Sequence, residues 1–210
     1  MEKDRPTTSP PLSREQVAAL QEVAAIAAMQ AGNALSSLSR IPVQISAPEV
    51  SVLRLSEIPT LFGGLDAPAI GVLVPFQGDM EGNGLLLFPE KGIRELERAL
   101  LGLPIPAGDD LRRSAFAEIG NILTGKLLTV LSTLSEKIVV NLPPLVIQDM
   151  AGAILDAILA EVGARTDEVT VLVFKLSDPD GANLVRSVLI PGSAGIELFL
   201  EAAGRLKKDS

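Results

Sequence analysis

The chain has 210 residues, a formal net charge of -8 and a hydrophobic fraction of 47%, which is enough apolar material for one large globular domain or two small ones. The negative charge argues against nucleic acid as a partner, because a phosphate backbone requires a basic surface. Cysteine and histidine are both absent, which excludes thiol nucleophiles, imidazole acid–base chemistry, disulfides and the usual zinc ligands.

The N-terminal segment 1–12 is rich in Pro, Ser, Thr and charged residues, a composition typical of a disordered tail. The sequence has neither an apolar leader nor a run of about 18 uncharged apolar residues, so we expect no membrane insertion and a cytoplasmic location. A capping-box pattern at Ser13 and Gln16 then begins an apolar repeat of helical period, which predicts one long helix ended by Pro42.

Strand patterns follow the long helix. Segment 41–55 predicts two strands separated by a proline-containing turn, and segment 69–89 predicts a hairpin around GDMEGNG. This turn contains Asp79, Glu81 and Asn83, which could suggest calcium ligands, but the hairpin explains these residues better.

The same order of elements then occurs a second time. A short helix over 92–103 closes the first half, and Asp109 and Asp110 are placed to cap the helix that follows. The second half predicts helix 114–132, strand 138–148, helix 150–163, strands 170–176 and 184–191, and helix 195–206.

The two halves also agree in sequence when one is shifted by 96 positions, which places Pro48 on Pro144. We therefore predict an internally duplicated α/β protein, made of repeats at about 13–108 and 109–206. No long linker separates the repeats, so they should share one core, with two long helices side by side on a shared antiparallel sheet.

The helix over 114–132, SAFAEIGNILTGKLLTVLS, carries a carboxylate and a carboxamide on one face. Its apolar residues form a stripe that should face the core, and the side chains that should face solvent are Ser114, Glu118, Asn121 and, by position, Gly125. The glycine lowers the helix's intrinsic stability by about 1 kcal/mol relative to alanine and leaves room for close approach. Because a Glu and an Asn on a helix surface are most often ordinary solvated residues, they predict by themselves only a binding face.

This helix, the duplication and the segment DMAGAILDAILAEVG together resemble the CheC family of chemotaxis phosphatases, over about residues 12–206. The family pattern is Ser or Asp, three residues, Glu, two residues and Asn, which Ser114, Glu118 and Asn121 match. Members of this family hydrolyse the aspartyl phosphate of the response regulator CheY, so the resemblance implies that activity here.

The resemblance also implies a role for each residue of the helix face. Asn121 would enter the regulator's pocket and position the attacking water, and Glu118 would pair with the pocket's lysine, while Ser114 and Gly125 would contact the regulator. The Mg²⁺ would belong to the bound response regulator, so no cofactor of the chain's own is implied. Phosphoryl transfer depends mainly on positioning and charge stabilisation, which suits an amide.

The first repeat departs from this pattern. The residues that match Glu118 and Asn121 there are Glu22 and Ala25, and Met29 replaces the glycine. Alanine cannot orient a water molecule, so we predict that the first site is degenerate and that Glu22 is an ordinary solvated residue.

The segment from Asp149 onward has two interpretations that both stay open. Its apolar residues form a stripe that most simply packs on the sheet. In the family, however, the helix around this position binds the receptor deamidase CheD, which makes Asp149 a possible CheD contact. The alternative to a phosphatase is a non-enzymatic chemotaxis or flagellar-switch adaptor that binds CheY-P or CheD.

Overall fold

The computed structural model describes residues 12–102, 110–162 and 168–206, so the predicted tail up to residue 11 and Asp109 lie outside the described part. Its elements in chain order are α1 (Arg14–Ser39), β1 (Gln44–Ile45), β2 (Glu49–Arg54), the 3₁₀ helix η1 (Leu55–Leu61), β3 (Pro68–Gly78), β4 (Gly82–Pro89), α2 (Glu90–Leu101), α3 (Asp110–Ser135), β5 (Val139–Asn141), β6 (Leu145–Met150), α4 (Ala151–Val162), β7 (Glu168–Ser177), β8 (Asn183–Pro191) and α5 (Ser193–Leu206).

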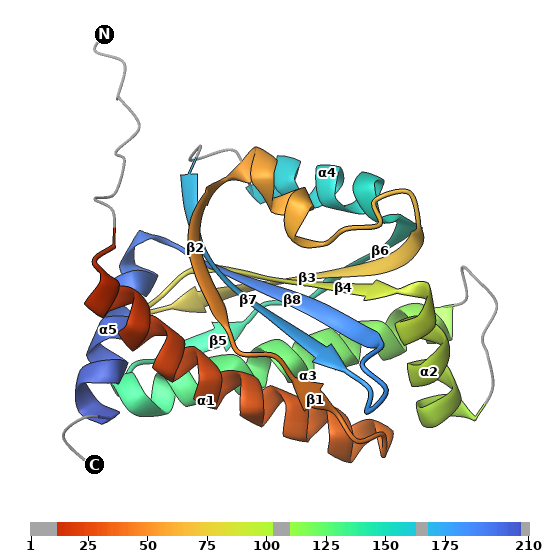
Figure 1. Ribbon diagram of the computed structural model, residues 1–210, viewed down its shortest axis with the longest axis horizontal. Coiled ribbons are helices and arrows are strands. Elements are labelled where there is room, and N and C mark those ends of the chain that lie inside the picture. Colours follow the sequence, from red (N-terminus) through yellow and green to blue (C-terminus); the bar gives the residue numbers. More distant parts are fainter. Residues whose placement is uncertain (1–11, 103–109, 163–167, 207–210) are drawn as a thin grey trace, which may run out of the picture.

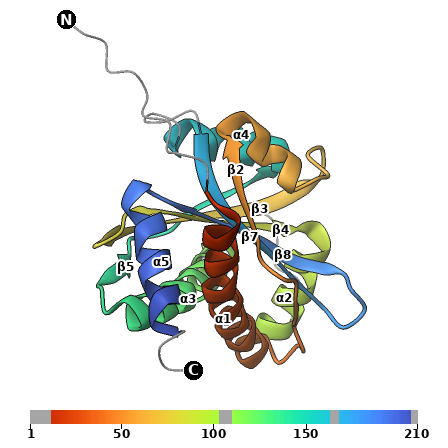
Figure 2. The ribbon, with the colours of Figure 1, turned by 60° about the vertical axis from the view of Figure 1, so that its left-hand side comes forward.

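Eight strands form one curled antiparallel sheet with the order β1-β7-β8-β4-β3-β5, in which β2 also pairs with β7 and β6 with β3. Helices α1, α2, α3 and α5 lie on one face of this sheet, and α4 and η1 lie on the other (Figure 1). The turned view shows α1 and α3 next to each other, with α5 beside both of them (Figure 2). The predicted α/β class, with two long helices on a shared antiparallel sheet, is therefore confirmed.

The long helices begin and end for local reasons. The predicted capping box is present, since Gln16 N donates to Ser13 Oγ at 3.2 Å and Ser13 N donates to Gln16 Oε1 at 2.8 Å. The end of α1 is set by Arg40 in the left-handed conformation, with φ 58°, before Pro42 is reached. The matching residue after α3, Glu136, has φ 57°, so both helices end at the same kind of left-handed residue.

Two details differ from the sequence prediction. Segment 138–148 is two strands instead of one, because Pro143 and Pro144 have no N–H to donate and interrupt the pairing of this segment with β3. In addition, η1 follows β2 without having been predicted, at the place in the first half that α4 occupies in the second.

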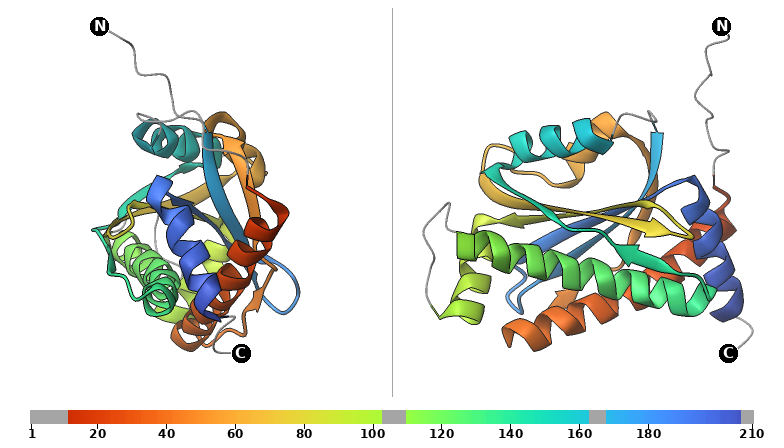
Figure 3. Two further views of the ribbon diagram at one scale, coloured as in Figure 1. Left: turned by 90° about the vertical axis from the view of Figure 1, so that its left-hand side faces the viewer. Right: turned by 180° about the vertical axis from the view of Figure 1, so that it is seen from behind.

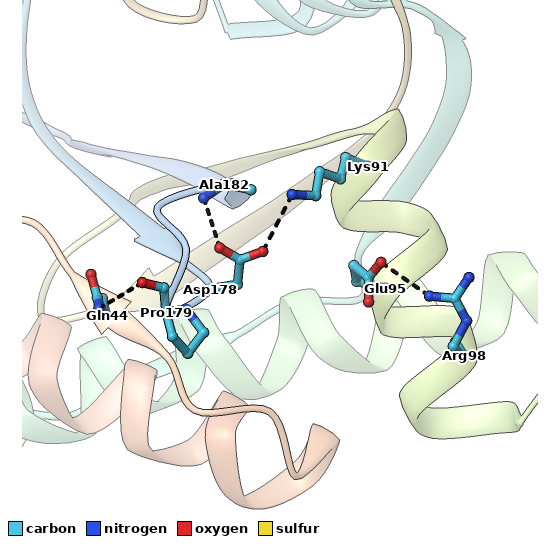
Figure 4. Close-up of polar contacts among 7 residues, drawn as sticks. All are labelled: Gln44, Lys91, Glu95, Arg98, Asp178, Pro179 and Ala182. Atoms are coloured by element: carbon cyan, nitrogen blue, oxygen red, sulfur yellow. Dashed lines mark hydrogen bonds and ion pairs between the residues drawn. The ribbon is translucent and has the colours of Figure 1, made fainter.

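Polar contacts tie the turn between β7 and β8 to elements of the first half (Figure 4). Asp178 accepts a hydrogen bond from Ala182 N at 2.7 Å, and its carboxylate lies 3.5 Å from Lys91 Nζ on α2. Gln44 on β1 donates to the carbonyl of Pro179 at 3.3 Å. The two halves are thus joined at this end of the sheet as well as through their shared strands.

Candidate functional site

Helix α3 is fixed to the sheet by an apolar face and by two close approaches. Phe116 is buried and meets Phe88 edge to face, with ring centroids 5.0 Å apart and an interplanar angle of 73°. A Cβ on Gly120 would lie 2.5 Å from Val72 Cγ1, and a Cβ on Gly84 would lie 2.8 Å from Thr124 Oγ1. Glycine at these two positions lets the helix lie close to β3 and β4, so the opposite face of α3 sits on a rigid support.

The four predicted residues lie together on that opposite face. Their spacing along α3 places Ser114, Glu118, Asn121 and Gly125 within a sector of about 60°. Ser114 and Glu118 are exposed, as expected. Asn121 and Gly125 lie on the same outer face but are half-buried, so they are less exposed than expected.

Asn121 is half-buried because Asn141, the last residue of β5, lies against it. Asn141 Nδ2 donates to Asn121 Oδ1 at 2.8 Å and to the main-chain oxygen of Asn121 at 2.9 Å. The view from behind shows α3 in green with β5 running beside it (Figure 3). The carboxamide oxygen of Asn121 has two lone pairs, and this contact uses one of them.

Gly125 completes this arrangement one turn further along α3. A Cβ at this position would lie 3.3 Å from Asn141 Nδ2, a tighter contact than most real Cβ atoms make. The room that the sequence predicted beside the glycine is therefore partly filled by the chain's own Asn141. Sequence reasoning missed this residue, although a polar Asn within the apolar run IVVNL was a usable signal.

The first repeat presents a different surface at the matching positions of α1. Glu22 and Ala25 are both exposed, and Met29 is 49% exposed. The residue that matches Asn141 there is Ile45, which contacts α1 at Gly32, where an added Cβ would lie 2.3 Å from Ile45 Cδ1. The residue that matches Asn141 is thus apolar, and its contact with α1 lies about two turns beyond Ala25.

The other acidic candidates have local partners. Asp149 is exposed, and its Oδ1 accepts a hydrogen bond from Met150 N at 2.7 Å, next to the start of α4. Asp79 Oδ2 accepts from Ile138 N at 2.8 Å beside the turn between β3 and β4. Among the described residues, no group of three or more Asp or Glu is placed to hold a metal ion, and no helix is long and apolar enough to cross a membrane.

Comparison with known proteins finds relatives that share this arrangement of helix and strand. A family model described as chemotaxis phosphatase CheX matches residues 70–162, which include α3 and β5. The chain is 28% identical over 172 residues to a Bacillus subtilis protein named CheY-P phosphatase CheC, a match that covers 80% of this chain and 82% of that protein.

Solved structures agree on the fold. The crystal structure of Thermotoga maritima FliY matches with a TM-score of 0.70 at 20% identity, covering 96% of this chain and all 100% of that one. Chemotaxis protein CheX from Desulfovibrio desulfuricans matches with a TM-score of 0.56 at 16% identity, covering 81% of this chain and 99% of that one. Together these comparisons confirm the resemblance to the CheC family that the sequence predicted.

Proposed function

We propose that this chain, as a relative of the CheC-type phosphatases, hydrolyses the aspartyl phosphate of a CheY-like response regulator. The observation that supports this most strongly is the placement of Asn121, a carboxamide on the outer face of a rigid helix, one turn from the exposed carboxylate of Glu118. The similarity to a protein named CheY-P phosphatase supports the choice of substrate.

The chemistry requires a water molecule in line with the bond between phosphorus and the aspartate oxygen. Water attacks phosphorus with one lone pair, and the bond to the aspartate oxygen breaks with its electron pair leaving on the aspartate. Both water hydrogens stay with the phosphate, so the products are dihydrogen phosphate and the free aspartate carboxylate. The attacking water needs an acceptor for one of its hydrogens, and Asn121 Oδ1 keeps one lone pair for that purpose. Asn121 would therefore act by positioning the nucleophile rather than by taking up charge.

Glu118 would hold the regulator in register. Its carboxylate is exposed one turn before Asn121, where it can pair with a lysine of the regulator's phosphorylation pocket. The Mg²⁺ that supports phosphoryl transfer would be bound by the regulator. Ser114 and Gly125 would complete the contact face, on either side of the pair.

The proposal also includes a location and a second partner. A cytoplasmic location fits a protein whose substrate is a CheY-like response regulator. The receptor deamidase CheD is a second candidate partner, with Asp149 beside the start of α4 as its contact, since that residue is exposed.

The test is the decay of a phosphorylated CheY-like regulator with and without the chain, measured as release of inorganic phosphate. The wild type should accelerate decay, and Asn121→Ala should lower kcat by about 10²-fold or more, as loss of a preorganised hydrogen-bonding group does in other enzymes. Binding of the regulator to Asn121→Ala, measured by titration calorimetry, should be largely kept. If the wild type binds the phosphorylated regulator without accelerating its decay, the protein is an adaptor and the proposal fails.

A further inference from the structure

We infer that Asn141 is a positioning residue of this site. It holds the carboxamide of Asn121 in one of the two orientations that an amide flip, the exchange of Oδ1 and Nδ2, would interconvert. The inference rests on the proposed function and adds a residue to the same site. It follows from the two hydrogen bonds that Asn141 Nδ2 donates, one to the main chain and one to the side chain of Asn121.

The main-chain bond decides which end of the Asn141 amide faces α3. The main-chain carbonyl of Asn121 belongs to the helix backbone, so its orientation is fixed. An atom that lies 2.9 Å from this oxygen must be a hydrogen-bond donor. The Nδ2 group of Asn141 must therefore face the helix, because its Oδ1 at that distance would meet another acceptor.

This orientation in turn decides how Asn121 is placed. With the Nδ2 donors of Asn141 fixed, Oδ1 of Asn121 is favoured at 2.8 Å and the flipped amide, which would place one amino group against another, is disfavoured. The terminal torsion of an asparagine is otherwise broad, so it does not select an orientation without such a partner. The hydrogen bond therefore directs the carboxamide oxygen that would accept from the attacking water.

Asn141 is also not the residue that stability alone would select. Its Oδ1 is buried without a hydrogen-bond partner among the described residues, and an unpaired buried acceptor is destabilising. In the first repeat, where Ala25 stands in place of Asn121, the matching residue is the apolar Ile45. The two carboxamides are thus present together in one repeat and replaced together in the other.

The test uses two variants of the full chain in the phosphate-release assay. Asn141→Ile introduces the residue of the first repeat, and Asn141→Asp keeps the shape while removing both N–H donors. Each should lower kcat on the order of tenfold, because Asn121 then samples unproductive orientations, whereas KM for the regulator should stay within about twofold since Glu118 is untouched. Thermal unfolding of both variants checks that they remain folded.

A double-variant measurement separates positioning from a general structural role. If Asn141 acts through Asn121, adding Asn141→Ile to Asn121→Ala should not lower the residual rate further. Wild-type kcat in both Asn141 variants, with Asn121→Ala inactive, would overturn the inference and leave the proposed function intact. If the wild-type chain itself has no activity, the proposed function fails and the inference falls with it.

Discussion

The two halves of the molecule place a 26-residue helix on the same face of one sheet, and they differ in what each helix presents to its surroundings. In the second half, Asn121 on α3 is held by Asn141 from β5. In the first half, Ala25 stands on α1, and Ile45 from β1 packs against Gly32 instead.

The difference is what we expect if the first copy serves stability and the second copy serves the proposed chemistry. The Ile45 contact buries apolar surface against the helix, which is favourable without any requirement for orientation. The Asn141 contact fixes an orientation and leaves a buried oxygen with no hydrogen-bond partner in the described part of the chain. A hydrogen-bonded pair such as Asn121 and Asn141 is expected where a side chain must be directed toward a bound partner.

The largest difference between matched variants of the two halves is expected in KM, when the carboxylates Glu118 and Glu22 are each changed. Glu118→Gln should raise KM for the phosphorylated regulator about tenfold, because the regulator's lysine loses a charged partner in the interface. Glu22→Gln is the control, since Glu22 is exposed at the matching position of α1 and should leave KM unchanged. Steady-state phosphate release measures both variants, and equal effects would show that the first face also binds the regulator.

An intermediate effect should appear in stability when the helix glycines are changed. Gly32→Ala should lower the free energy of unfolding by about 1–2 kcal/mol, because the new Cβ overlaps Ile45 by more than helix propensity offsets. The Cβ of Gly125→Ala would meet, of the atoms that the structure describes, only Asn141 Nδ2 at 3.3 Å, so this variant should raise stability by up to about 1 kcal/mol. Urea unfolding compares the two variants.

Activity should rank the same two glycine variants in the reverse order from stability. Gly125→Ala should lower kcat several-fold despite its stability, because the amino group of Asn141 must move by a few tenths of an ångström. Gly32→Ala should keep the kcat of the folded fraction. A fully active Gly125→Ala would show that the position of Asn141 is not critical.

The smallest effect is expected from restoring the lost amide. Ala25→Asn in the Asn121→Ala background should raise phosphate release by no more than about twofold, because the residue that matches Asn141 in this half is Ile45, which has no amide to orient the new side chain. Full recovery of the wild-type rate would contradict this and show that the first face needs only an amide to work.

Much of the fold could be predicted from the sequence because its signals are local. The capping box at Ser13, the hairpin of β3 and β4 and the shift of 96 positions each depend on residues close in sequence or on simple repetition. The left-handed ends at Arg40 and Glu136 carry no such signal, because neither residue is a glycine. The η1 helix was also missed, because its segment matches no clear period.

The candidate site was predictable only in part. The helical period places Ser114, Glu118 and Asn121 on one outer face, and their position there agrees with the structure. The contact between Asn121 and Asn141 joins residues 20 positions apart on different elements, so it depends on how β5 docks beside α3. Tertiary packing of this kind leaves only an indirect trace, here the single polar residue in an apolar strand.

The most direct test is to map which helix binds the regulator. A ¹⁵N-labelled sample of the chain is titrated with a CheY-like regulator held in its activated state by beryllofluoride and Mg²⁺, and the backbone amide resonances of α1 and α3 are followed. We predict that resonances of residues 114–125 shift or broaden while those of residues 18–29 stay in place. Perturbation of α1 instead, or of both helices equally, would contradict the proposal that the second half alone carries the site.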